Sequence, residues 1–125
     1  MPKTAYIIGD ADRVREKVEA AMFDHDLDRL SRFSRSLSNA VSFVVQELEE
    51  RLGARTIMAG GDDVLFIIHF DSSVKEVLED VAICFSDLSS CTMSFGVAPT
   101  IEDAYLNLRK AKASGGGIVE SGLTK

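Results

Sequence analysis

The tetrapeptide Gly60-Gly61-Asp62-Asp63 constrains the fold of this chain more than any other segment, because strand-like sequences flank it on both sides. Residues 55–59 precede it and residues 64–68 follow it, and both segments are rich in apolar and β-branched side chains. Glycine supplies the positive φ that a tight turn needs, and aspartate tolerates turn conformations. The segment therefore predicts a β-hairpin with two glycines and two carboxylates at its tip.

A second acidic pair, Asp10 and Asp12, follows an expected first strand at residues 4–9. If this strand lies beside the hairpin, Asp10 and Asp62 meet at the same end of the sheet. Clustered carboxylates repel one another, and a cation is the usual compensation. Two acidic strand ends are typical of a two-metal phosphoryl-transfer site, because Mg²⁺ and Mn²⁺ prefer oxygen ligands. The tetrapeptide alone would be an ordinary turn, so the predicted metal site depends on this convergence.

Apolar spacings of three and four residues indicate two helices between the first strand and the hairpin. The second of them is long, from about residue 26 to residue 52, and Gly53 ends it as a C-terminal cap. The first runs from about residue 12 to about residue 24, and its apolar face consists of Val14, Val18, Ala21 and Met22.

Two capping motifs predict the remaining helices. A Ser-x-x-Glu capping box at residues 73–76 begins one helix. A Thr-x-x-Asp motif at residues 100–103 begins another, which runs to about residue 114. Strands are expected at residues 92–98 and 118–120. The resulting order, β-α-α-β-β-α-β-α-β, contains the split β-α-β plan of ferredoxin-like α+β folds, with helices on one face of a mostly antiparallel sheet.

Composition restricts the classes of protein further. A chain of 125 residues suits one domain, here residues 1–125, and its net charge of −6 argues against direct binding of long nucleic acids. No apolar run approaches the roughly 20 residues of a membrane span, so we expect no membrane insertion. The N-terminus carries no secretory signal, and a cytoplasmic location is expected. Cys84 and Cys91 form no Cys-x-x-Cys pair, so zinc is not expected and both are predicted to be small core residues.

Two features leave alternatives open. Asp12 stands where the first helix begins, so its segment could hold phosphate groups on free backbone N–H groups, or Asp12 could simply cap the helix. Arg109, Lys110 and Lys112 fall in the last turns of the last helix, where basic residues either bind phosphate or only complement the helix dipole.

Four segments, taken in order, resemble GGDEF nucleotide cyclases and, more closely, the palm domain of the large subunit of type III CRISPR complexes. A stand-alone relative of that palm, the minimal CRISPR polymerase domain (mCpol), has about this size. The resemblance implies a ferredoxin-like palm that condenses nucleoside triphosphates into cyclic nucleotide messengers. The segments are residues 6–12, residues 60–63, residues 94–98, and residues 108–112 with Gly115.

The resemblance also implies a set of site residues. Asp10 and Asp62 would hold two Mg²⁺ or Mn²⁺ ions, helped by the carbonyl group of Ala11 and with Asp63 close by. The backbone from Asp12 to Val14 would cradle the β- and γ-phosphates, and Lys112 would bind phosphate. The residues implied to contact the nucleotide are therefore Ala11, Asp12, Arg13, Val14, Gly60, Gly61 and Lys112.

Base preference and partners follow from the same resemblance. The position that reads guanine in GGDEF proteins is Val18 here, and a basic position of that family is Gly116, so the resemblance does not imply guanine specificity. The aspartate at the third position of the 60–63 motif follows the CRISPR palm, which uses ATP, so we expect ATP to be favoured. The implied product is a cyclic di- or oligonucleotide such as cyclic di-AMP, made in anti-phage defence and sensed by a separate membrane effector. Since each chain offers one nucleotide pocket, a homodimer is expected. A catalytically silent nucleotide-binding module and a diguanylate cyclase remain the alternatives.

Overall fold

The structure, a computed structural model, describes residues 3–117 and 119–121. It confirms the predicted order of helices and strands, although Ile118, expected to begin the last strand, lies outside the described residues. The elements are β1 (Lys3–Ala11), α1 (Val14–Phe23), α2 (Leu27–Leu52), β2 (Arg55–Gly60), β3 (Asp63–Phe70), α3 (Val74–Ser89), β4 (Met93–Ala98), α4 (Ile101–Ala113) and β5 (Val119–Ser121). Among the described helices, none is long and apolar enough to cross a membrane.

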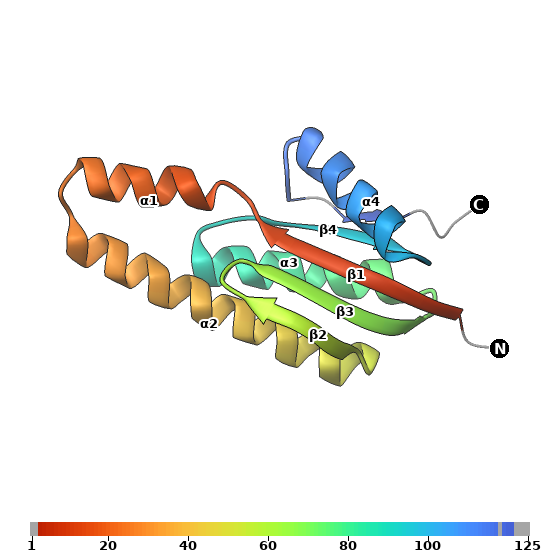
Figure 1. The fold of residues 1–125 in the computed structure, drawn as a ribbon. Coiled ribbons are helices and arrows are strands. Elements are labelled where there is room, and N and C mark those ends of the chain that lie inside the picture. The colour runs from red at the N-terminus through yellow and green to blue at the C-terminus, as the bar shows by residue number, and fades with distance from the viewer. Residues whose placement is uncertain (1–2, 118, 122–125) are drawn as a thin grey trace.

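The five strands form one sheet in the order β2-β3-β1-β4-β5 (Figure 1). Only the pairing of β4 with β5 is parallel, so the mostly antiparallel α+β sheet is confirmed. β1 extends further than predicted, because Asp10 and Ala11 still pair with Ser94 and Met93 of β4. Asp10 therefore belongs to the strand and does not follow it.

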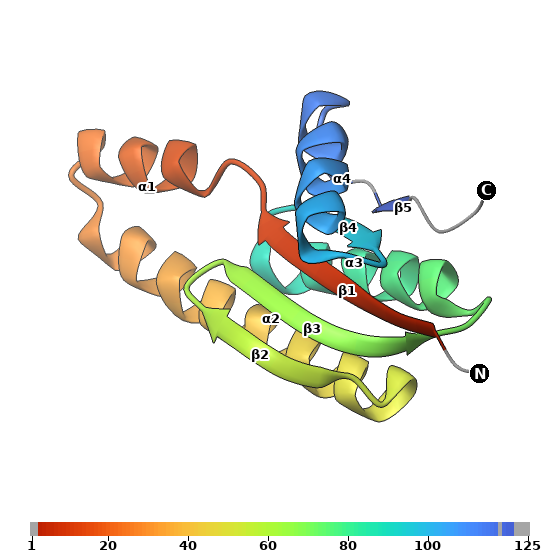
Figure 2. The ribbon, with the colours of Figure 1, turned by 45° about the vertical axis from the view of Figure 1, so that its right-hand side comes forward.

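The sheet is covered on both faces. α2 and α3 lie behind it and bury the main core, and α4 crosses the opposite face (Figures 1 and 2). The expectation of helices on one face therefore holds for α2 and α3 and does not extend to α4. The close approach of α4 depends on Gly96, where a Cβ atom would lie 2.1 Å from the Ala104 carbonyl oxygen and 2.4 Å from the Leu108 nitrogen. As a result, every residue of β4 is buried.

α1 and the first turns of α2 extend beyond the ends of the strands, past the C-terminal end of β1 (Figures 1 and 2). Val14 at the start of α1 packs against the core, but Ala21 is the only buried residue of this helix. The predicted apolar face of α1 is therefore wrong at Met22, which is 52% exposed. The reason is positional, since α1 leaves the sheet after its first turn.

The predicted helix caps differ in outcome. Gly53 adopts the left-handed conformation after α2, and the Thr100 hydroxyl oxygen accepts a hydrogen bond from the Asp103 amide, so both predictions are confirmed. The prediction of a capping box at Ser73 is wrong, because the Ser73 side chain makes no capping hydrogen bond to α3. Ser73 has helical backbone angles, and both its amide and its hydroxyl donate to the Asp71 carboxylate instead.

The two cysteines differ in burial. Cys91 is buried as predicted, but Cys84 is exposed, so its assignment to the core was wrong. α3 packs on the sheet through residues such as Val81 and Phe85, and Cys84 falls on the outward side of this helix.

Replacing Gly96 by alanine is expected to destabilise the fold by about 3 kcal/mol or more, because the new methyl group would meet the rigid backbone of α4. Gly60→Ala is the matched control, since a Cβ atom there meets nothing within 4 Å. Urea denaturation of both variants tests the prediction. Equal stability of the two variants would contradict the close packing of α4 on β4.

Candidate active site

The hairpin tip is tied to β1 by a specific hydrogen bond. Gly61 takes a positive φ of 60°, and the turn of Gly61 and Asp62 joins Gly60 to its cross-strand partner Asp63. The Asp62 carbonyl oxygen accepts a hydrogen bond of 3.0 Å from the Ala11 amide. This contact holds the turn against the end of β1 and explains why the two acidic segments meet.

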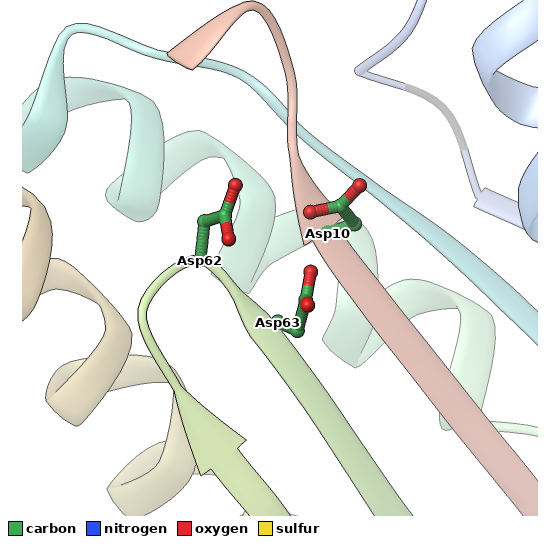
Figure 3. Close-up of side chains that lie close together, drawn as sticks. All are labelled: Asp10, Asp62 and Asp63. Atoms are coloured by element: carbon green, nitrogen blue, oxygen red, sulfur yellow. The ribbon is translucent and has the colours of Figure 1, made fainter. Parts of the chain in front are cut away.

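Three carboxylates converge at this end of the sheet. Asp10 and Asp63 are direct partners in the ladder between β1 and β3, and Asp62 extends toward them from the turn (Figure 3). Each of the three residues offers a carboxylate oxygen, and these oxygens all lie within 4.8 Å of one another. The predicted convergence of Asp10 with Asp62 is confirmed, and Asp63 belongs to the same cluster.

The cluster is electrostatically unfavourable without a cation. Burial and a hydrogen bond with Asp63 raise the pKa of Asp10 from 3.8 to about 6, although Lys112 opposes the shift. Asp10 and Asp62 are partly buried, and Asp63 is exposed, so the site is open to solvent on one side. An arrangement of three carboxylates that favours protonation of one member fits a hard divalent cation such as Mg²⁺ or Mn²⁺.

Lys112, near the end of α4, is the cation of the site in this structure. Its Nζ lies 3.1 Å from Asp10 Oδ2 and 2.7 Å from Asp12 Oδ1. It also donates to the carbonyl oxygens of Asp10 and Ala11, both at 3.3 Å. Burial alone would lower the pKa of Lys112, but the two carboxylates outweigh it and raise the pKa. Lys112 is therefore charged and surrounded by oxygen atoms.

Asp12 is a structural anchor and not the helix cap that was considered as one alternative. Arg13, in the left-handed conformation, occupies the N-cap position of α1, and no side chain caps that helix. The Asp12 carboxylate is only 7% exposed and accepts hydrogen bonds from the Thr92 and Ser94 hydroxyls, the Gly117 amide and Lys112. It is thus fully engaged and lies outside the acidic cluster.

These hydrogen bonds also set the charge of Asp12. Burial would raise its pKa, but the bonds from Lys112, Thr92, Gly117 and Ser94 outweigh burial and lower the pKa. The Asp12 amide donates to the Thr92 carbonyl oxygen at 2.8 Å, so it is already paired. The sequence did not identify Thr92, Ser94 and Gly117 as partners of Asp12. The one available signal was Ser94, a hydroxyl side chain within an otherwise apolar strand.

The other basic residues of α4 differ from Lys112. Arg109 is exposed and lines a pocket that also contains Asp10 and Lys112. Lys110 is exposed and lies outside that pocket, as a solvated residue near a helix end would.

Replacing Asp10 by asparagine should stabilise the metal-free protein increasingly as the pH rises. The folded pKa of about 6 lies above the ordinary 3.8, so the folded chain binds more protons in this window, and the contribution of Asp10 to stability falls with rising pH. The stability advantage of Asp10→Asn over the parent chain should therefore grow by up to about 3 kcal/mol between about pH 4 and about pH 7. Urea titrations without divalent ions measure it.

The control is Asp87→Asn, which changes an exposed carboxylate on α3. It removes one carboxylate that lies outside the acidic cluster, and the pH dependence of Asp10→Asn is read against it. A constant or shrinking advantage of Asp10→Asn would contradict the raised pKa of Asp10.

Solved structures with the same fold include nucleotide-binding proteins. The chain superposes with a TM-score of 0.71 and 18% identity on a Csm1-Csm4 cassette in complex with cA4, where it covers 94% of this chain and 20% of that one. It superposes with a TM-score of 0.66 and 17% identity on the GGDEF domain of DgcB from Caulobacter crescentus in complex with c-di-GMP, covering 94% and 77% of the two chains.

A third structure, the active GGEEF domain of a diguanylate cyclase from Vibrio cholerae, gives a TM-score of 0.65 at 11% identity and covers 98% of this chain and 84% of that one. At these identities the superpositions establish the fold alone. The chain spans only a fifth of the length of the chain that it matches in the Csm1-Csm4 cassette.

The sequence comparison identifies the family. No curated protein matches this chain. The family model of the minimal CRISPR polymerase domain matches residues 6–121. This range includes all three carboxylates of the cluster and Lys112. The chain therefore belongs to the minimal CRISPR polymerase (mCpol) family.

Proposed function

We propose that this protein is a metal-dependent nucleotidyltransferase that condenses nucleoside triphosphates, with ATP favoured, into a cyclic di- or oligonucleotide. The observation that carries the proposal is the convergence of Asp10, Asp62 and Asp63 beside the ammonium group of Lys112. This arrangement combines metal ligands with a phosphate-binding cation, and its setting is a palm fold related to nucleotide cyclases.

Asp10, Asp62, Asp63 and the carbonyl oxygen of Ala11 would hold two Mg²⁺ or Mn²⁺ ions. Bound ions of this kind lower the pKa of an attacking ribose hydroxyl and neutralise charge on departing pyrophosphate. The hydroxyl oxygen of one nucleotide forms a bond to the α-phosphorus of another, and the bond from that phosphorus to the bridging oxygen breaks. The hydroxyl proton passes to solvent, and a second such step closes the ring.

The chain itself supplies the phosphate contacts. The backbone N–H groups at the start of α1, from Arg13 and Val14 onward, have no side-chain cap and can bind phosphate oxygens. The Asp12 amide is paired with Thr92, so Asp12 contributes by holding Lys112, and not as part of the cradle. Lys112 would exchange one of its carboxylate contacts for a phosphate oxygen.

The finer points of the proposal rest on the relatives. The Csm1-Csm4 cassette has been solved with one ATP as well as with cA4, which supports adenine. DgcB was solved with c-di-GMP, so a diguanylate cyclase is the alternative. A single site per chain and the joining of two nucleotides favour a homodimer with facing sites. We further propose a cytoplasmic role in anti-phage defence, with a separate membrane effector that senses the product.

The test is incubation of the protein with each of the four nucleoside triphosphates and Mg²⁺ or Mn²⁺, followed by phosphatase treatment and mass spectrometry. We expect a phosphatase-resistant cyclic oligoadenylate and release of pyrophosphate. A cyclic guanine product would favour the diguanylate alternative. Nucleotide binding without any product would favour a catalytically silent module and overturn the proposal.

Asp62→Asn and Asp63→Asn should each lower the rate of product formation by at least about a hundredfold, because each removes a metal-binding charge. Asp87→Asn, which lies outside the cluster on α3, should leave the rate unchanged. Circular dichroism establishes that the variants fold. Unaltered turnover in either cluster variant would remove that carboxylate from the site.

A further inference from the structure

A basic hollow lies where α1 and the first turns of α2 extend beyond the ends of the strands (Figures 1 and 2). Its volume is about 610 Å³, and its walls are α1, the first turns of α2 and the C-terminal end of α3. None of its lining residues belongs to the acidic cluster or lines the pocket beside that cluster, so the two sites are separate. The charged side chains that line the basic hollow are Lys17, Asp24, Arg29 and Arg32.

This excess of cations is unusual in an acidic protein. The chain carries a net charge of −6, and the linings of four other hollows each contain at least as many carboxylates as cations. The basic hollow instead contains three cations and one carboxylate. A concave surface lined by charges of one sign raises the local concentration of ions of the opposite sign. The basic hollow is therefore suited to an anion.

Two of its cations are unpaired within the described part of the chain. The Asp24 carboxylate forms an ion pair of 3.0 Å with Arg29. Neither Lys17 nor Arg32 forms an ion pair with any residue that the structure describes. Lys17 comes from α1 and Arg32 from α2, so a ligand between the two helices can contact both charges.

The end of α3 forms the inner wall of the basic hollow. Ser90 lines the hollow there, and Ser36 lines it from α2, so both walls carry a hydroxyl group. Burial raises the pKa of the Cys91 thiol, which follows Ser90 in the chain, and the charge of Lys17 opposes this rise. The ammonium group therefore lies near the inner wall. Ammonium, guanidinium and hydroxyl groups are the donors that commonly bind phosphate oxygens.

We propose that the basic hollow binds a small anion that carries phosphate groups, held between Lys17 and Arg32. The hydroxyl groups of the walls are further donors. Inorganic pyrophosphate and nucleotides share this chemistry, and Phe33 in the lining offers an aromatic surface to a base. Since the cations of the hollow supply the positive charge, binding there needs no metal ion. The inference goes beyond the proposed function and does not depend on it.

An anion bonded to both cations would connect α1 to α2. Ala21 is the only buried residue of α1, so side-chain packing contributes little to the position of this helix. The inner wall also leads to Thr92, two residues after Ser90, and the Thr92 hydroxyl donates to the Asp12 carboxylate. An occupied hollow would therefore restrain α1, whose first backbone N–H groups belong to the phosphate cradle of the proposed function.

The experiment is isothermal titration calorimetry in EDTA, with inorganic pyrophosphate and ATP as separate probes. Without divalent ions the carboxylates of the acidic cluster repel phosphate groups, so binding reports on the basic hollow. Arg32→Gln should weaken binding of both probes about tenfold, because it removes a charged donor. Arg35→Gln is the matched control, since Arg35 is exposed on the same helix but lies outside the hollow, and it should bind as the parent does.

The two probes distinguish the sources of the ligand. Tighter binding of ATP than of pyrophosphate would identify a nucleotide as the ligand. Otherwise the hollow recognises the phosphate groups alone. Hydrogen exchange with pyrophosphate in EDTA should slow at the amides of α1 and stay unchanged at the hairpin residues 60–63.

Three results would overturn the inference. These are no binding of either probe to the parent chain, the same affinity in Arg32→Gln and Arg35→Gln, and protection from exchange at the hairpin instead of α1. Arg32→Lys, which keeps the charge, should bind more tightly than Arg32→Gln, and circular dichroism establishes that all variants fold. The proposed function is judged separately, by product formation with Mg²⁺ or Mn²⁺, so either conclusion can fail without the other.

Discussion

The antiparallel pairing of β1 with β3 places two carboxylates, Asp10 and Asp63, directly opposite each other, and the rest of the site depends on this pairing. Like charges at opposed positions destabilise a sheet. The hydrogen bond from the Ala11 amide to the Asp62 carbonyl oxygen adds a third carboxylate to the same end. Burial first, and then the hydrogen bond with Asp63, raise the pKa of Asp10 at this position. Such a cluster makes physical sense as a binding site for cations and not as a stabilising feature of the sheet.

The ion pair of Asp12 with Lys112 opposes the repulsion between the clustered carboxylates. Asp12 is buried and satisfied by hydroxyl and amide donors, so it fixes the ammonium group of Lys112 beside Asp10. The same carboxylate attaches the glycine turn after α4 to the start of β4, and a Cβ atom at Gly116 would lie 2.8 Å from its carboxylate carbon. The Asp12 carboxylate thus connects the end of β1 with β4 and α4. The same contacts therefore determine both the charge beside Asp10 and the position of α4.

The parts of the site that the sequence predicts are the local ones. The Gly60-Gly61 turn, the acidic hairpin tip and the order of elements follow from turn chemistry and periodicity, and the convergence of Asp10 with Asp62 follows from strand adjacency. The parts that it does not predict depend on contacts far apart in the chain. Thr92 lies 80 residues from Asp12, and the close approach of α4 to β4 depends on the missing Cβ atom at Gly96. The β-bulge before Met58 in β2 has no local signature either.

The most direct test of the account is a crystal structure with Mn²⁺ and a non-hydrolysable ATP analogue, read by anomalous scattering from manganese. Two anomalous peaks about 3.5–4 Å apart are expected, as in other two-metal sites, coordinated by the carboxylates of Asp10, Asp62 and Asp63. Phosphate density should adjoin both ions and Lys112. Bound nucleotide with no manganese at the cluster, or manganese held only by other residues, would contradict the account.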